Sequence, residues 1–173
     1  MLKRKLGKSN LEVSAIGLGC NNFGGRTDLE TTRKIVHHAI DAGITHFDTA
    51  DVYGHRGGSE TALGLYLGAR RKDIVIASKF GNPMDDAGPL KGASRRYIVS
   101  AVEASLKRLK TDWIDIYQLH KFDPATPIDE TMRAFDDLIK QQEAKLTEVK
   151  DKIKECNEEL NLLNQVKFVF SEE

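Results

Sequence analysis

The sequence has no excess of charge of either sign. Lysine and arginine together number 26, aspartate and glutamate together number 26, and the formal net charge at pH 7 is zero. Proteins that bind nucleic acid or an anionic membrane surface usually carry a clear excess of positive charge. The balance therefore gives no electrostatic reason to expect nucleic acid or a membrane surface as a partner.

Long hydrophobic runs are also missing. The apolar stretches extend over only a few residues, whereas a membrane-spanning helix needs about 20. Residues 1–6 read MLKRKL and lack the apolar core of a secretory signal. We therefore expect no membrane insertion and a cytoplasmic protein.

Cysteine is scarce, with Cys20 and Cys156 as the only two. They form no CxxC motif and no metal-ligand spacing, so the sequence predicts two free thiols in a reducing compartment. Neither a disulfide framework nor a metal site is expected.

Glycine and proline disappear after residue 140. All 14 glycines, all 4 prolines and the single tryptophan lie before it, and lysine and glutamate dominate the residues after it. A shift of this kind marks two regions of different structure. We predict one domain over residues 1–141 and a helical extension over residues 142–173.

The first region alternates short apolar runs with longer helical patterns. This alternation predicts an α/β fold of parallel strands joined by right-handed crossovers, preceded by a hairpin over residues 3–7 and 11–14. The strands are expected at 15–19, 44–49, 74–78 and 113–119, and the helices at 28–42, 59–67, 94–109 and from residue 128 onward. Four such βα units form either an open sheet or half of an eight-stranded barrel.

The second region repeats its apolar residues with a spacing of three and four. The positions are Ile139, Leu146, Val149, Ile153, Cys156, Leu160 and Leu163, with Gln142 as the one interruption. This spacing predicts a coiled-coil helix continuous with the helix from residue 128, and an amphipathic helix packed on its own domain is the alternative. Its expected partner through residues 139–163 is a second copy or another helix. Residues 166–170 alternate like a short strand, or form a frayed end.

Four chemically active side chains follow the predicted strands at their carboxyl ends, where barrel enzymes place their active sites. They are Asp48, Tyr53, Lys79 and His120. An unperturbed tyrosine is a poor acid at neutral pH, but a nearby ammonium favours its phenolate, and a carboxylate holds that ammonium in place. Such a group suits protonation of a carbonyl oxygen, with the imidazole orienting the carbonyl or sharing the proton.

Several motifs around these residues resemble the aldo-keto reductase family. They are HFDTADVYG at 46–54, SE at 59–60, ASK at 77–79, SLKRL at 105–109 and DIYQLH at 115–120, within a match over about residues 3–141. The resemblance implies half of a (β/α)8 TIM barrel, a small carbonyl substrate, NADPH as cofactor and Tyr53 as general acid. It also implies that Gly19, Cys20, Asn21 and Asp48 lie near the cofactor.

After Gln141 the sequence departs from the family pattern. Residues 142–145 continue the helix, where the family has a turn, a fifth strand and a Ser-Asn motif. We therefore expect most of the cofactor-binding half to be absent, which leaves two functions open. One is a reductase whose site is completed by self-association, and the other is a non-catalytic interaction or fusion protein in which a reductase fragment joins a coiled-coil segment. A flavodoxin-like cofactor binder is disfavoured, because no phosphate loop follows the first strand.

Overall fold

The computed structural model describes residues 1–86, 88 and 90–169, with side chains described as far as residue 161. The chain opens with an antiparallel hairpin of β1 (Lys3–Lys5) and β2 (Glu12–Ser14). Gly7 lies in the connection with φ 59°, a conformation that glycine adopts without strain. The predicted hairpin is confirmed.

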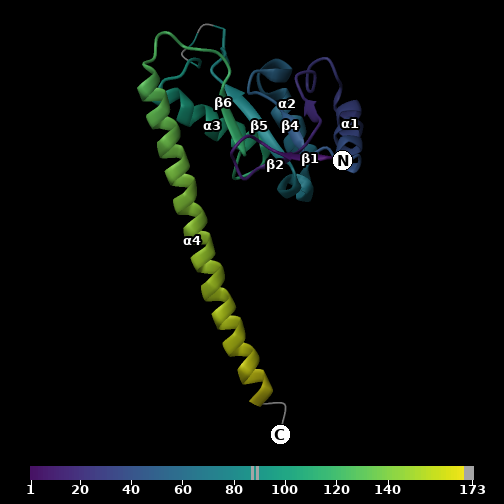
Figure 1. The fold of residues 1–173 in the computed structure, drawn as a ribbon, viewed down its shortest axis with the longest axis vertical. Helices are drawn as coiled ribbons and strands as arrows, with labels where there is room; N and C mark the ends of the chain where they lie inside the picture. The colour runs from purple at the N-terminus through teal and green to yellow at the C-terminus, as the bar shows by residue number, and fades with distance from the viewer. Residues whose placement is uncertain (87, 89, 170–173) are drawn as a thin grey trace. The chain divides into compact units, whose positions relative to one another are not determined.

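Four parallel strands form the sheet of the first region (Figure 1). Strand order follows chain order, and each strand is hydrogen-bonded to the next. The strands are β3 (Gly17–Gly19), β4 (His46–Asp48), β5 (Val75–Phe80) and β6 (Ile116–Leu119). Each is shorter than or shifted from its predicted range, but all four predicted strands are present, so the prediction of repeated βα units is confirmed.

The helices between these strands begin where the sequence supplies capping residues. Asp28 accepts a hydrogen bond from the Thr31 amide at the start of α1 (Leu29–Asp41), and Ser94 caps α3 (Arg95–Leu109) in the same way. A side-chain oxygen here satisfies an amide that has no partner within the helix. Between them lie α2 (Tyr53–Tyr66) and the 3-10 helix η1 (Gly68–Asp73).

The hydrophobic core lies between the sheet and these helices. Phe47 of β4 and Ile76 of β5 are fully buried there, together with Leu63 of α2. Along β4 and β5 the side chains alternate between the two faces of the sheet, so Asp48 and Lys79 share the face opposite to Phe47 and Ile76. Packing of Phe47 and Ile76 in the core thereby fixes the positions of Asp48 and Lys79 on the opposite face of the sheet.

The long helix α4 (Ile128–Val169) has 42 residues and follows β6. Its first turns belong to the sheet domain: Thr131 donates a hydrogen bond to the Ala93 carbonyl at 3.0 Å. The chain forms two compact units, residues 1–134 and residues 135–173. The predicted domain boundary at residue 141 stays a prediction.

The end of α4 differs from one prediction. Residues 166–169 are helical, so the short strand expected over 166–170 is wrong as far as Val169, and Phe170 lies outside the described residues. A helix that already runs from Ile128 satisfies the backbone hydrogen bonds of each next turn, whereas a five-residue strand needs a partner strand to satisfy its own. The predicted long C-terminal helix is confirmed.

Candidate active site

The carboxyl ends of the four parallel strands form one rim. Asp48 is the last residue of β4, Lys79 lies near the end of β5, His120 follows β6 directly, and Tyr53 begins α2. Backbone hydrogen bonds continue past the strand ends, from the Cys20 amide to the Asp48 carbonyl and from the His120 amide to the Phe80 carbonyl, each at 2.8 Å. These bonds hold the rim in a fixed register.

The Lys79 ammonium lies at the centre of the rim. Its Nζ is 2.8 Å from Oδ1 of Asp48 and donates hydrogen bonds to the Thr49 carbonyl at 2.9 Å and to the Tyr53 hydroxyl at 3.5 Å. The Lys79 side chain is 15% exposed, whereas that of Asp48 is 42% exposed. One partly buried cation therefore connects a carboxylate to a phenol, the arrangement that the sequence predicts.

His120 packs edge-on against Tyr53. The ring centroids are 5.6 Å apart at an interplanar angle of 86°. Burial lowers the pKa of His120, and the Lys79 charge lowers it further, while Asp48 opposes both. The imidazole is thus neutral at pH 7, a form in which one ring nitrogen donates a hydrogen bond and the other accepts one.

A left-handed turn brings Tyr53 onto the rim. Residues 54–57 have positive φ inside the span of α2, including φ 59° at His55 and 67° at Arg56. A Cβ added to Gly54 would lie 2.2 Å from the Phe23 carbonyl oxygen, so only glycine fits there. The helical path is kinked directly after Tyr53, and no pattern in the sequence predicts this turn.

Buried hydroxyl groups join the loops behind the rim. Ser59 donates a hydrogen bond to the Cys20 carbonyl at 2.8 Å, and its hydroxyl lies 2.8 Å from that of Thr49. Ser59 and Thr49 are fully buried. They connect the ends of β3 and β4 to α2, and so position the residues that flank Asp48 and Tyr53.

Behind the rim lies a second group of charged residues that sequence reasoning missed. Glu60 is fully buried, accepts a hydrogen bond from Ser78, and pairs with Arg108 at 2.7 Å. Asp51 is 1% exposed, and no hydrogen-bond partner of its carboxylate oxygens is found in the described part of the chain. Burial raises the pKa of Asp51 to about 7, and the negative charge of Glu60 adds to this. Glu60 lies in the predicted helix over 59–67 and Asp51 in the loop before it, and neither position indicates a buried side chain.

The three other residues predicted near a cofactor occupy different environments. Gly19 and Asn21 are exposed at the rim, next to the paired Asp48. Cys20 is fully buried in the hydrophobic core, and burial raises the pKa of its thiol. The Cys20 side chain therefore packs in the core, whereas Gly19 and Asn21 are exposed where a ligand could reach them.

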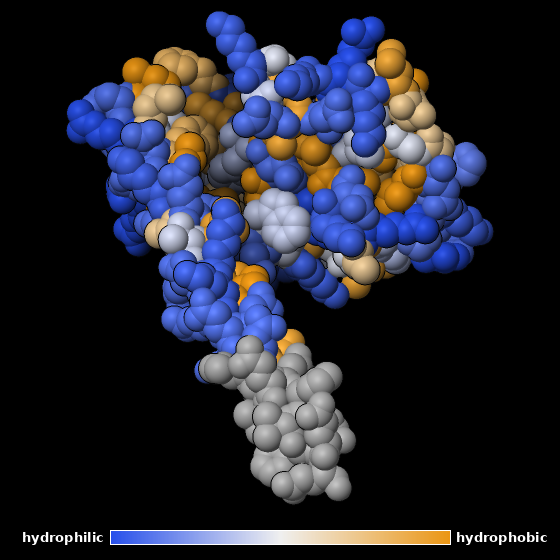
Figure 2. Space-filling view, turned by 60° about the horizontal axis from the view of Figure 1, so that its bottom comes forward, coloured by the Kyte–Doolittle hydropathy of each residue, from blue (hydrophilic) through white to orange (hydrophobic). Residues whose placement is uncertain are grey.

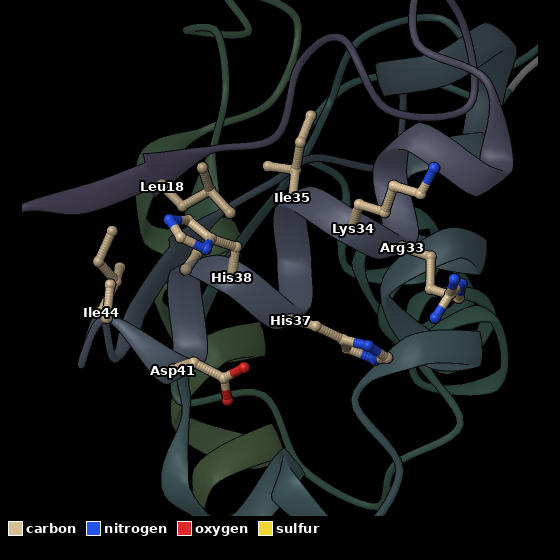
Figure 3. Close-up of a pocket in the computed structure, with 10 residues that line it drawn as sticks. Leu18, Arg33, Lys34, Ile35, His37, His38, Asp41 and Ile44 are labelled. Atoms are coloured by element: carbon tan, nitrogen blue, oxygen red, sulfur yellow. The ribbon is translucent and has the colours of Figure 1, made fainter.

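A cavity of about 880 Å³ lies away from the rim, beside α1 (Figure 3). Leu18, Ile35 and Ile44 line its apolar side, and Lys34 and His38 lie among the polar residues around it. It includes none of the four rim residues. Among the residues that the structure describes, no helix is long and apolar enough to cross a bilayer, and no cluster of three or more metal-ligating side chains is present.

Known proteins share the sequence of this region. The profile of the Aldo/keto reductase family matches residues 15–149. The uncharacterized oxidoreductase YqkF of Bacillus subtilis is 46% identical over 140 residues, which cover 80% of this chain and 45% of that protein. The L-glyceraldehyde 3-phosphate reductase of Escherichia coli K12 is 39% identical, over 78% of this chain and 40% of that protein.

A solved structure shares the fold as well. An aldo-keto reductase from Bacillus halodurans, in its holo form, superposes with a TM-score of 0.74 and is 42% identical, covering 82% of this chain and 47% of that one. The chain thus spans less than half the length of these relatives, and the half-barrel prediction agrees with the part that superposes. By sequence and by fold, the chain belongs to the aldo/keto reductase family.

Proposed function

We propose that this chain carries the proton-donating side of an NADPH-dependent carbonyl reductase. The observation that supports this is the position of the Lys79 ammonium, between the Asp48 carboxylate at 2.8 Å and the Tyr53 hydroxyl at 3.5 Å. The ammonium lies where it would offset the negative charge that develops on the Tyr53 oxygen as its proton leaves. Asp48 balances the charge of Lys79 and keeps the ammonium in place.

Proton transfer would run from Tyr53 to the substrate. The Tyr53 O–H donates its proton to the carbonyl oxygen, which becomes the hydroxyl of the product alcohol, and the phenolate left behind faces the Lys79 ammonium. The neutral His120 beside Tyr53 would orient the carbonyl through a hydrogen bond. Bulk solvent then returns a proton to Tyr53.

The family is typically NADPH-dependent, and the donor set of the rim fits the reacting end of this cofactor. When bound, NADPH would supply the hydride that reduces the carbonyl carbon. Asp48, Gly19 and Asn21 border the open side of the rim and would contact the nicotinamide and its ribose. Reaction requires that the carbonyl be held within reach of both donors, and therefore that the rest of the cofactor be bound.

Cofactor titration tests this proposal directly. We would titrate the purified chain with NADPH and follow the fluorescence of the nicotinamide rather than that of tryptophan. Trp113 stacks on Arg71 before β6 begins, at the end of the sheet away from the rim, so its fluorescence would not report on the rim. The assay substrate would be a short aldehyde such as glyceraldehyde, chosen after the E. coli relative's name. Saturable binding with aldehyde reduction is expected, and Tyr53→Phe should lower the rate at least about a hundredfold while leaving NADPH affinity within about twofold.

Binding without any reduction by the unmodified chain would contradict the proposal, as would equal rates for the unmodified chain and Tyr53→Phe. Ser100→Ala serves as the matched control, since the Ser100 hydroxyl donates a hydrogen bond to the Tyr97 carbonyl on α3 and lies outside the rim.

A second candidate is a non-catalytic interaction protein. The observation that favours it is the row of exposed apolar side chains on α4, which has no role in carbonyl reduction. Failure of NADPH to bind at millimolar concentration would favour this candidate over the reductase.

A further inference from the structure

An uncovered apolar stripe runs along α4 beyond the sheet domain. Its five large side chains are 52–57% exposed; they are Ile139, Leu146, Val149, Ile153 and Leu160. Cys156, on the same stripe, is also exposed. In the space-filling view, hydrophobic patches interrupt the otherwise hydrophilic surface of the long helix (Figure 2). Residues spaced three and four apart lie on one side of an α-helix, which makes this a continuous seam.

The apolar positions of the seam match those of a second copy that runs antiparallel to it. Two antiparallel copies aligned on their centres place Leu146 against Cys156 and Val149 against Ile153, and each pairing occurs twice by symmetry. Gln142 then faces Leu160 at each end of this segment. In this alignment no polar side chain is paired with its own copy across the seam.

Charges that flank the seam distinguish the two possible directions. In the antiparallel arrangement Lys145 lies beside Glu159 of the second copy, so two attractive pairs form. Lys150 and Lys152 each meet their own copy near the centre, and the Lys152 charge is already paired with Glu148 at 2.6 Å on its own helix.

The parallel arrangement has no such compensation. There Lys145 would face Lys150 of the second copy twice, and no opposite charges would meet at the flanking positions of residues 139–160. Like charges at these positions oppose association. The flanking charges therefore select the antiparallel direction.

We propose that this chain forms a homodimer through an antiparallel coiled coil of α4, centred near residue 151. Burial of the five apolar side chains on each copy supplies the free energy of association, and the flanking charges supply the direction. The inference is independent of carbonyl reduction, because it uses no residue of the rim.

Cysteine cross-linking in the full-length chain tests the direction. We would compare the unmodified chain, Leu146→Cys and the control Thr147→Cys at about 50 μM, oxidised with copper phenanthroline and mapped by mass spectrometry. Leu146→Cys should form a disulfide to Cys156 of the second copy in most molecules. The unmodified chain should not, since its two Cys156 residues would be separated by several helical turns. Cys20 is buried and does not interfere.

A disulfide between two Cys156 residues in the unmodified chain would overturn the proposal in favour of a parallel pair. Equal cross-linking of Leu146→Cys and Thr147→Cys would also overturn it, because Thr147 lies outside the seam. A strictly monomeric mass in sedimentation at about 200 μM would exclude a dimer of either kind.

Charge reversal gives a second readout that needs no oxidation. Lys145→Glu should raise the dimer dissociation constant roughly three- to tenfold in the antiparallel arrangement, because it places two glutamates side by side. Adding Glu159→Lys should restore the original value. Tighter association of Lys145→Glu would overturn the proposal, since only the parallel arrangement gains attraction to Lys150 from this change.

Discussion

Asp51 lies behind the rim with its carboxyl group in a poor environment for charge. Burial and the nearby Glu60 raise its pKa to about 7, whereas an aspartate in an unfolded chain ionises near pH 4. Between these two pH values the unfolded state loses this proton and the folded state keeps it. The free energy of unfolding therefore falls as pH rises from about 4 to about 7, and this loss is complete above that range.

Asp51→Asn removes this pH dependence. The variant should match the unmodified protein near pH 4 and be more stable at pH 8 by about 1–4 kcal/mol, because an amide carries no charge to bury. Urea unfolding followed by Trp113 fluorescence measures the difference, with the exposed Glu30→Gln as the control. An identical stability difference at both pH values would show that the pKa of Asp51 is the same in the folded and unfolded states.

Glu60 is the fully buried partner of Arg108 and Ser78. Glu60→Gln keeps the shape of the side chain but leaves the Arg108 guanidinium without its counter-ion, so we expect a loss of about 2–4 kcal/mol in the free energy of unfolding. The matched control is Glu148→Gln, which breaks an exposed pair and should cost less than about 0.5 kcal/mol. Equal small losses for both would mean that solvent replaces Glu60 beside Arg108.

At the scale of elements, α3 packs directly against α2 at Gly64. A Cβ at this position would lie 2.2 Å from the Arg108 carbonyl oxygen, which is backbone and cannot turn aside. Gly64→Ala should therefore lower the free energy of unfolding by about 1–3 kcal/mol, despite the better helix propensity of alanine. Thermal unfolding of Gly64→Ala and Gly19→Ala provides the comparison, because a Cβ at Gly19 meets no atom within 4 Å. A fall in stability confined to Gly19→Ala would contradict this account of the packing.

Most elements could be predicted from the sequence because their signals are local. The caps Asp28 and Ser94 act on amides three residues away, and the four strands are short apolar runs between helical patterns. The predicted strand over 113–119 begins only at Ile116, because Trp113 and Asp115 instead contact the buried Arg71. That contact joins residues more than forty positions apart, and no local pattern indicates it.

The candidate site divides in the same way. Asp48, Lys79 and His120 were predictable because each follows an apolar strand, and parallel strands end at one edge. The turn after Tyr53 was not predictable, since His55 and Arg56 adopt positive φ that their residue types disfavour. Glu60 lies in the predicted helix over 59–67 and Asp51 in the loop before it, positions at which acidic residues are usually exposed. Their burial depends on distant residues, such as Ser78 and Arg108 for Glu60, which no local pattern indicates.

At the scale of the whole molecule, the sheet domain presents two edge strands. In the described part of the chain β3 is hydrogen-bonded only to β4, and β6 only to β5. The relatives that match this chain are about twice as long as the region they share with it. Exposed strand edges favour association with further strands. If the molecular mass rises with protein concentration, the association therefore has two possible physical sources, the sheet edges and the seam of α4.

Hydrogen exchange separates these two sources. Every side chain described from residue 143 to 161 is exposed, so in a monomer this part of α4 has only its own backbone hydrogen bonds to slow exchange, and an isolated helix is marginally stable in water. We expect amides of residues 142–160 to exchange at least about tenfold faster at 1 μM than at 200 μM, while buried amides of β5 exchange at one rate. Protection that changes instead in β3 and β6 would place the association at the sheet edges. Slow exchange of α4 at a concentration where the mass is monomeric would mean that this helix is covered within its own chain.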